Sequence, residues 1–149
     1  MQVSELFIPE RVSVGCHLSD KTHALQAVAE LLAGDGPDHD AIVEALTTRE
    51  RLASTGVGSG VAIPHGRVEG LDGVRVAVVT CPDGVDFAAV DGELVHILIG
   101  ILAPQRRPTE HLKVLARVSR LLRDDDTRDR LRRAETPAEL VRVLAEAAC

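Results

Sequence analysis

A histidine between a proline and a glycine is the residue best placed to do chemistry in this chain. This histidine, His65, lies near the end of the segment 49–67. In this segment the end of a helix is followed by three glycines at alternate positions and then by a short apolar strand. Pro64 restricts the backbone and Gly66 adds no side chain, so His65 is held where a buried strand reaches the surface. Imidazole titrates near neutrality, so a neutral ring with a free nitrogen is available there as a nucleophile.

The glycines do not form a nucleotide-binding motif. A Rossmann fingerprint needs strand, glycine turn and helix in that order, whereas here a helix precedes the spacing Gly56-x-Gly58-x-Gly60 and a strand follows it. A P-loop needs Gly-Lys-Ser/Thr, and no lysine lies between Lys21 and Lys113. We expect the glycines either to let the backbone pass close to another helix or to hold a phosphoryl group through amide N–H groups.

Arg49 and His111 are polar residues on helix faces that the apolar spacing predicts to be buried. The stripe with Arg49 near its centre consists of Ile42, Ala45, Leu46, Leu52 and Ala53. The stripe that contains His111 consists of Val114, Leu115, Val118 and Leu122. Arginine matches phosphate in bidentate geometry, and a helix N-terminus favours a nearby anion, so both residues could serve an anion site. Alternatively, Arg49 reaches solvent and complements its helix dipole, and His111 is a core histidine bonded to the backbone.

The other histidines are weaker candidates. His96 lies inside an apolar strand and is expected to be a structural donor. A zinc site made of His65, His96 and His111 is conceivable, but no close ligand pair such as H-E-x-x-H supports it, so we expect no metal. Three further histidines near turns or helix starts are expected to be solvated: His17, His23 and His39.

The hydrophobic pattern predicts an α/β fold in one domain, residues 1–149, with a sheet flanked by helices. The expected helices cover residues 20–33, 38–53 and 108–122, a short charged helical turn covers 124–134, and a last helix begins at Pro137. The expected strands cover residues 61–63, 74–81 and 94–103. The last strand is apolar on both faces, which is typical of a central strand covered on both sides. The sequence Thr136-Pro137-Ala138-Glu139 combines a capping box with proline at the first helical position.

Composition limits the possible partners. The chain has 149 residues, a net charge of −6, two phenylalanines and no tyrosine or tryptophan, so we expect no nucleic-acid binding. Three widely spaced cysteines without a C-x-x-C motif suit a reducing compartment. The longest apolar run is too short to cross a bilayer and the N-terminus lacks a secretory pattern, so we expect a cytoplasmic protein without membrane insertion.

Residues 54–66, Ser-Thr-Gly-Val-Gly-Ser-Gly-Val-Ala-Ile-Pro-His-Gly, resemble the active-site segment of the EIIA domains of the bacterial phosphotransferase system. The similarity is to the fructose, mannitol and nitrogen-regulatory class, and it extends in order over the whole chain. Arg49, the segment 87–92 and the segment 111–116 also match. His96 and the basic connection 105–108 depart from the pattern of the family.

The resemblance implies that His65 accepts a phosphoryl group on its tele nitrogen from a phosphohistidine carrier of the HPr type. It makes His111 the second active-site histidine and Arg49 a phosphate-stabilising residue. It implies a mixed parallel and antiparallel sheet between helices, and no cofactor. Four residues of the glycine segment are expected to contact the phosphate: Thr55, Gly56, Gly58 and Gly60.

The downstream role has three alternatives. We expect a free-standing domain without attached permease or EIIB segments, and free-standing members often resemble the nitrogen-related regulatory branch, which we favour. The second alternative is a sugar-transport EIIA that passes its phosphate to a separate EIIB. The third is a binding module that keeps the fold without turnover, and the presence of His65, His111 and Arg49 argues against it.

Overall fold

Five α-helices surround one six-stranded sheet in the computed structural model, which describes residues 2–36 and 38–148. The elements in chain order are the 3-10 helices η1 (Val3–Leu6) and η2 (Pro9–Arg11), β1 (Val12–Ser13), α1 (Lys21–Ala33), α2 (His39–Leu52), β2 (Gly56–Gly58), β3 (Val61–Ala62), β4 (His65–Val68), β5 (Arg75–Val85), β6 (Val95–Pro104), α3 (Pro108–Leu121), α4 (Asp125–Arg133) and α5 (Pro137–Ala147).

The sheet is mixed, as predicted. Its strand order is β1-β5-β6-β3-β2, and β4 also pairs with β6. β5 and β6 are antiparallel, whereas β3 and β4 both run parallel to β6. Val61 pairs with Ile97 and His65 with Ile101, which is the same register, so β3 and β4 are two parts of one interrupted strand.

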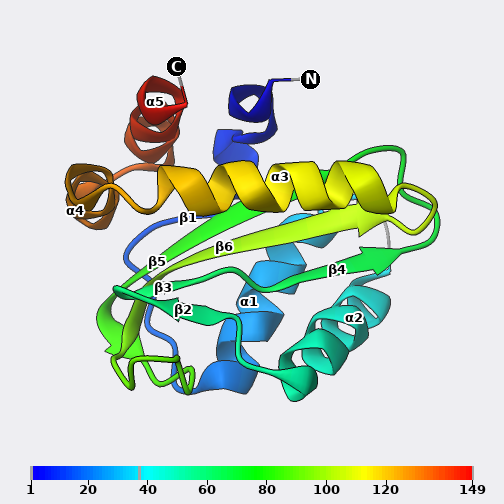
Figure 1. Ribbon diagram of the computed structural model, residues 1–149, viewed down its shortest axis with the longest axis horizontal. Helices are drawn as coiled ribbons and strands as arrows, with labels where there is room; N and C mark the ends of the chain where they lie inside the picture. Colours follow the sequence, from blue (N-terminus) through cyan, green and yellow to red (C-terminus); the bar gives the residue numbers. More distant parts are fainter. Residues whose placement is uncertain (1, 37, 149) are drawn as a thin grey trace.

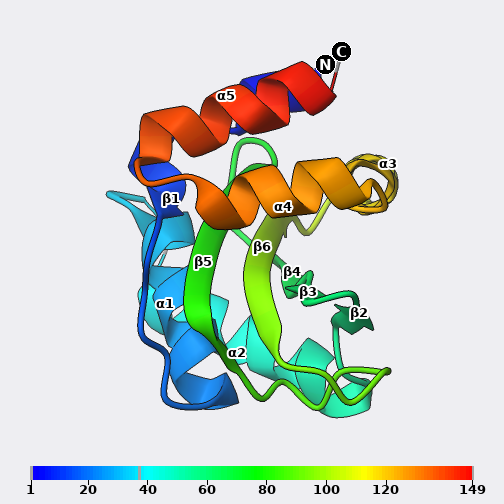
Figure 2. The ribbon, with the colours of Figure 1, turned by 90° about the vertical axis from the view of Figure 1, so that its left-hand side faces the viewer.

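Helices cover both faces of this sheet, which confirms the predicted layers. α3 crosses one face with α4 and α5 on its side, and α1 and α2 cover the other face (Figures 1 and 2). Because side chains alternate along a strand, β6 contributes Ile97, Ile99 and Ile101 to the α3 side and Leu98 and Leu102 to the α1 side. Among the described residues, no helix has the length and apolar character needed to cross a membrane.

Local signals set the helix ends where the sequence predicts them. Asp20 caps α1 by accepting from the His23 N–H, and Gly34 ends that helix. Thr136 caps α5 by accepting from the Glu139 N–H, but the Glu139 carboxylate accepts from the Glu135 N–H rather than completing a capping box on Thr136.

Several elements differ from the expectation. The strands β1, β2 and β4 are not predicted by the pattern, because two to four residues are too short for a periodic signal and their pairing partners are distant in sequence. The charged segment 124–134 is helical as expected, but it is longer than one turn: it forms the nine-residue helix α4, capped by Asp124. β5 runs beyond its expected end to Val85, across an irregular stretch between Thr80 and Val85.

Candidate functional site

His65, Arg49 and His111 line one cleft, of about 890 Å³, between α2, β4 and the start of α3. These elements converge at the right-hand end of Figure 1. The rings of His65 and His111 meet edge to face, with their centroids 5.2 Å apart and an interplanar angle of 66°. Tertiary structure therefore brings together three residues whose outer members, Arg49 and His111, lie 62 positions apart in the sequence.

A hydrogen bond to the main chain selects the tautomer of His65. Its Nδ1 lies 2.8 Å from the carbonyl oxygen of Ile63, which can only accept, so Nδ1 carries the hydrogen and Nε2 keeps a lone pair. The Ile63 N–H donates to the Thr55 carbonyl at 2.9 Å. β2 and β3 form an antiparallel hairpin, and β3 ends at Ala62. In extended backbone the N–H and C=O of one residue point to the same side, so the Ile63 carbonyl faces the β2 side just beyond the end of the hairpin. The histidine ring takes the place of a ladder partner.

The residues on either side of His65 hold its backbone. The Pro64 carbonyl accepts from the Ile101 N–H at 3.0 Å, which continues the pairing with β6 across the interruption. A Cβ atom on Gly66 would lie 3.1 Å from the Ala45 Cβ, so the absence of a side chain allows β4 to pack closely on α2. This close approach places the last turns of α2 beside His65.

Burial keeps both histidines neutral. Burial lowers the pKa of His65 below its ordinary value, the hydrogen bond to Ile63 opposes this, Arg49 lowers the pKa further, and Glu50 raises it. Burial also lowers the pKa of His111, to about 4, with smaller contributions from His65 and Arg67. At pH 7 the cleft thus presents two neutral imidazoles.

His111 also holds an unsatisfied polar atom. Its side chain is buried, and among the described residues its Nε2 has no hydrogen-bond partner. A buried polar atom without a partner costs free energy, and native structures contain few of them. An oxygen-rich group bound beside His65 would give this nitrogen a partner.

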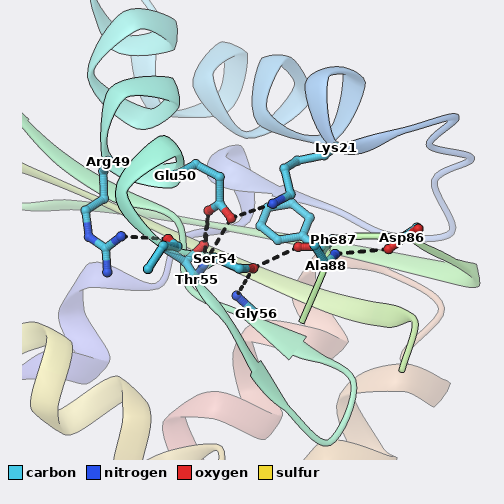
Figure 3. Close-up of polar contacts among 10 residues, drawn as sticks. Lys21, Arg49, Glu50, Ser54, Thr55, Gly56, Asp86, Phe87 and Ala88 are labelled. Carbon is cyan, nitrogen blue, oxygen red and sulfur yellow. Dashed lines mark hydrogen bonds and ion pairs between the residues drawn. The ribbon is translucent and has the colours of Figure 1, made fainter. Parts of the chain in front are cut away.

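Arg49 does not lie at the centre of a buried stripe. The buried residues of α2 are Ile42, Leu46 and Glu50, and Arg49 is half-buried beside them. The predicted stripe is wrong also for Leu52, the last residue of α2, which is 79% exposed instead of packed. One guanidinium nitrogen of Arg49 donates to the Ala53 carbonyl at 2.8 Å (Figure 3). Its other N–H groups have no partner among the described residues and are available to an anion in the cleft.

Glu50 is a buried polar residue of this region that the sequence patterns did not predict. Its buried carboxylate accepts from the Thr55 N–H, from Thr55 Oγ1 at 2.5 Å and from Lys21 Nζ at 2.8 Å (Figure 3). The available signal was its position eight residues after Ile42, on the face shared with Leu46.

The glycine segment lies outside the cleft lining. The amides of Thr55 and Gly56 donate to Glu50 and to Ser54 Oγ, and neither Gly58 nor Gly60 lines the cleft. The expectation that these glycines approach a helix is wrong for Gly56, where a Cβ atom would lie 2.8 Å from the Cβ of a residue in the loop 86–92. The phosphate-binding role of these four residues stays a prediction.

The three-histidine zinc alternative is wrong on geometry. His96 lies five residues before Ile101, the pairing partner of His65, which is about 16 Å along β6. Its Nδ1 lies 3.1 Å from the Cys81 carbonyl, beside the irregular stretch of β5, so it has the structural role expected of it. Within the described part of the chain, no three histidine, cysteine or acidic residues are grouped as metal ligands. The remaining histidines are exposed as expected: His17, His23 and His39.

Comparisons with known proteins agree with one another. Residues 5–147 match the family described as phosphoenolpyruvate-dependent sugar phosphotransferase system, EIIA 2. A nitrogen regulatory protein of Bradyrhizobium diazoefficiens is 36% identical over 97% of this chain and 95% of its own length. The crystal structure of nitrogen regulatory protein IIA-Ntr from Neisseria meningitidis superposes with a TM-score of 0.89 at 29% identity, covering 95% of this chain and 98% of that one. Enzyme IIA-mannitol of Escherichia coli, solved in complex with phosphorylated enzyme IIB-mannitol, gives a TM-score of 0.77 at 28% identity and covers 92% and 95%.

The low pKa of His111 predicts a pH-dependent stability. An unfolded histidine binds a proton below a pH of about 6.5, whereas burial lowers the pKa of His111 in the folded protein to about 4. Between these two values the unfolded state binds more protons, so the free energy of unfolding falls as the pH falls from 6.5 toward 4. Between pH 7 and 5, the free energy of unfolding of the wild type should fall more steeply than that of His111→Gln. The difference in slope should approach about 1.4 kcal/mol per pH unit at most. Urea denaturation at several pH values measures it.

The control for this experiment is His39→Gln, at an exposed histidine of the same protein. It should keep the slope of the wild type. If the free energy of unfolding had the same dependence on pH in the wild type and in His111→Gln, burial of His111 would not oppose its protonation.

Proposed function

The chain belongs to the EIIA 2 family of the phosphoenolpyruvate-dependent sugar phosphotransferase system, and we propose that it carries a phosphoryl group on Nε2 of His65. The observation that carries this proposal is the hydrogen bond from Nδ1 to the Ile63 carbonyl. It leaves the Nε2 lone pair as the nucleophile on a ring that burial keeps neutral.

In the proposed transfer the lone pair of His65 Nε2 attacks the phosphorus of a phosphohistidine on an HPr-type carrier. The new N–P bond forms as the donor's N–P bond breaks, and the donor imidazole leaves with the electron pair of that bond. Because no proton leaves His65, its phosphorylated ring is formally cationic with Nδ1–H in place. The Ile63 carbonyl then accepts a stronger, charge-assisted hydrogen bond.

Arg49 and His111 supply the surroundings of the phosphoryl group. Phosphoryl transfer asks a protein mainly for positioning and for stabilisation of charge on the equatorial oxygens. The free N–H groups of Arg49 suit those oxygens, and the unpartnered Nε2 of His111, when it carries the hydrogen, donates to one of them. This arrangement explains why a buried ring with an unsatisfied nitrogen stands in edge contact with His65.

We favour the regulatory branch for the downstream role. The relative in Bradyrhizobium diazoefficiens and the structure from Neisseria meningitidis are both named nitrogen regulatory proteins, and each matches nearly the whole chain. The alternative is transfer to an EIIB in sugar transport, which the complex of IIA-mannitol with IIB-mannitol supports by analogy. In either role we place the protein in the cytoplasm, where the free thiols of Cys16 and Cys81 persist.

Phosphorylation should depend on His65. Incubation with a phosphorylated HPr-type donor should add one phosphoryl group that is labile in acid and stable in base. His65→Ala should abolish it, because no other described histidine combines an edge position in the cleft with a tautomer fixed by Ile63. Intact-mass measurement gives the stoichiometry, and phosphorus–nitrogen couplings in NMR identify the tele nitrogen.

The exposed His23→Ala variant serves as the control and should be labelled like the wild type. Normal labelling of His65→Ala on another residue would refute the proposal.

Arg49→Ala and His111→Ala should each slow phosphorylation without replacing the acceptor. A lost hydrogen bond to a charged group is worth about 1.5–3 kcal/mol, so the rate should fall roughly tenfold to a hundredfold. Rapid-quench measurement with the phosphorylated donor gives the rates, and circular dichroism shows whether the variants are folded.

The matched control is Arg51→Ala, an exposed arginine in the same turn of α2. Its rate should equal that of the wild type. If both cleft variants also kept the wild-type rate, Arg49 would be only a helix cap and His111 only a core residue.

The regulatory role predicts partner binding that depends on phosphorylation. Leu52 and Leu112 line the same cleft as His65 and are 79% and 63% exposed. A phosphoryl group on His65 adds nearly two negative charges to this cleft, which a partner packing on the leucines would have to desolvate. At least one partner other than the phosphate donor should therefore bind phosphorylated protein and His65→Ala with different affinity in calorimetric titration. Equal binding of every partner, together with rapid loss of phosphate to an EIIB, would assign the chain to transport.

A further inference from the structure

Glu50 is a buried acid that the proposed transfer step does not use. It lies in the last turn of α2, and its carboxylate accepts from the Thr55 N–H, Thr55 Oγ1 and Lys21 Nζ (Figure 3). A carboxylate offers about four lone-pair sites, so three donors nearly saturate it. The group is therefore fixed in orientation, and so is the Thr55 backbone that it binds.

The hydrogen bonds continue from Thr55 to the proposed nucleophile. The Thr55 carbonyl accepts from the Ile63 N–H at 2.9 Å, and the Ile63 carbonyl accepts from His65 Nδ1 at 2.8 Å. Pro64 restricts Ile63 to extended backbone, so fixing the N–H of Ile63 also fixes the direction of its carbonyl. A displacement of Thr55 would therefore turn the acceptor that selects the histidine tautomer.

We propose that Glu50 is a positioning residue for His65, which acts through Thr55 and Ile63 to hold the imidazole in the Nδ1–H tautomer. The inference rests on the proposed function only in taking the freed Nε2 as the phosphoryl acceptor. Glu50 contacts no reacting atom, and apart from its electrostatic effect on the pKa of His65 it acts through the geometry of the ring.

Stability alone does not account for such a group. Replacing a buried ion pair by apolar residues is often neutral or stabilising, so the contact with Lys21 gives no reason in itself to keep a carboxylate at this position. A carboxylate does what an apolar residue cannot, since it binds two donors of Thr55 at once. Lys21 also lies 4.8 Å above the ring of Phe87, whose carbonyl accepts from Ser54 Oγ, so the same contacts anchor the loop beside the glycine segment.

Nearly isosteric changes at Thr55 test the proposal without removing a charge. Thr55→Val removes the Oγ1 donor and keeps the N–H, whereas Thr55→Ser keeps both. In nitrogen-15 NMR spectra at pH 7.5, wild type and Thr55→Ser should show His65 almost wholly as the Nδ1–H tautomer, and Thr55→Val should show a substantial Nε2–H population. Phosphorylation by the phosphorylated HPr-type donor should slow roughly tenfold in Thr55→Val, and Thr55→Ser should restore the rate.

A second test of the proposal removes the charge of Glu50. Glu50→Gln keeps the shape but weakens the bonds to Thr55, so it should shift the tautomer and slow phosphorylation tenfold to a hundredfold. The matched control is Glu30→Gln, the same chemical change at an exposed site on α1, which should alter neither.

A purely structural role would lower the melting temperature of these variants without moving the tautomer. Unchanged tautomer ratios and rates in folded Thr55→Val and Glu50→Gln would overturn the proposal. If Glu50→Gln does not fold, the Thr55 pair decides alone. The tautomer measurement needs no phosphate donor, so a wild type that cannot be phosphorylated would refute the proposed function and leave this test intact.

Discussion

The hydrogen bond from His65 to the Ile63 carbonyl is the interaction on which the chemistry of this protein depends. It decides which ring nitrogen is free, and it exists because a strand beside β6 is interrupted at Pro64. Before the interruption β3 pairs with β2 as well as with β6, and after it, among the described strands, β4 pairs with β6 alone. The Ile63 carbonyl lies at this change of pairing and accepts from the ring of His65, two residues later.

The rest of the fold makes this local arrangement rigid. β6 is covered on both faces, so the strand that supplies the frame for His65 cannot shift without disturbing two cores. Gly66, after His65, lets α2 approach closely. The hydrogen bonds from Thr55 to the Glu50 carboxylate link the end of α2 to the start of the β2–β3 hairpin. His65 is therefore held in a defined position, because its strand pairs with the buried strand β6.

The electrostatics of the cleft suit a histidine that is neutral at rest and carries a negatively charged phosphoryl group after reaction. Burial lowers the pKa of both histidines, which keeps the His65 lone pair available, and among the described residues it leaves Nε2 of His111 without a hydrogen-bond partner. Sites that hold polar groups in such unfavourable surroundings are typically functional, because the rest of the structure must supply the stability they lose. The incoming phosphoryl oxygens would satisfy the nitrogen and the remaining N–H groups of Arg49.

Local signals in the sequence are enough to predict several elements of the fold. Caps and apolar periodicity place α1, α3 and α5, the two-faced apolar run identifies β6, and the Pro-His-Gly triplet singles out His65. Contacts between distant segments, by contrast, depend on how the chain packs in three dimensions. The short strands β1 and β4 pair with the longer strands β5 and β6, and β2 pairs with β3. Arg49 is only half-buried and donates to the Ala53 carbonyl at the end of α2. In the sequence Glu50 cannot be distinguished from other charged helix residues. Its hydrogen bonds with Thr55 and Lys21 depend on proximity in space, which composition and spacing do not predict.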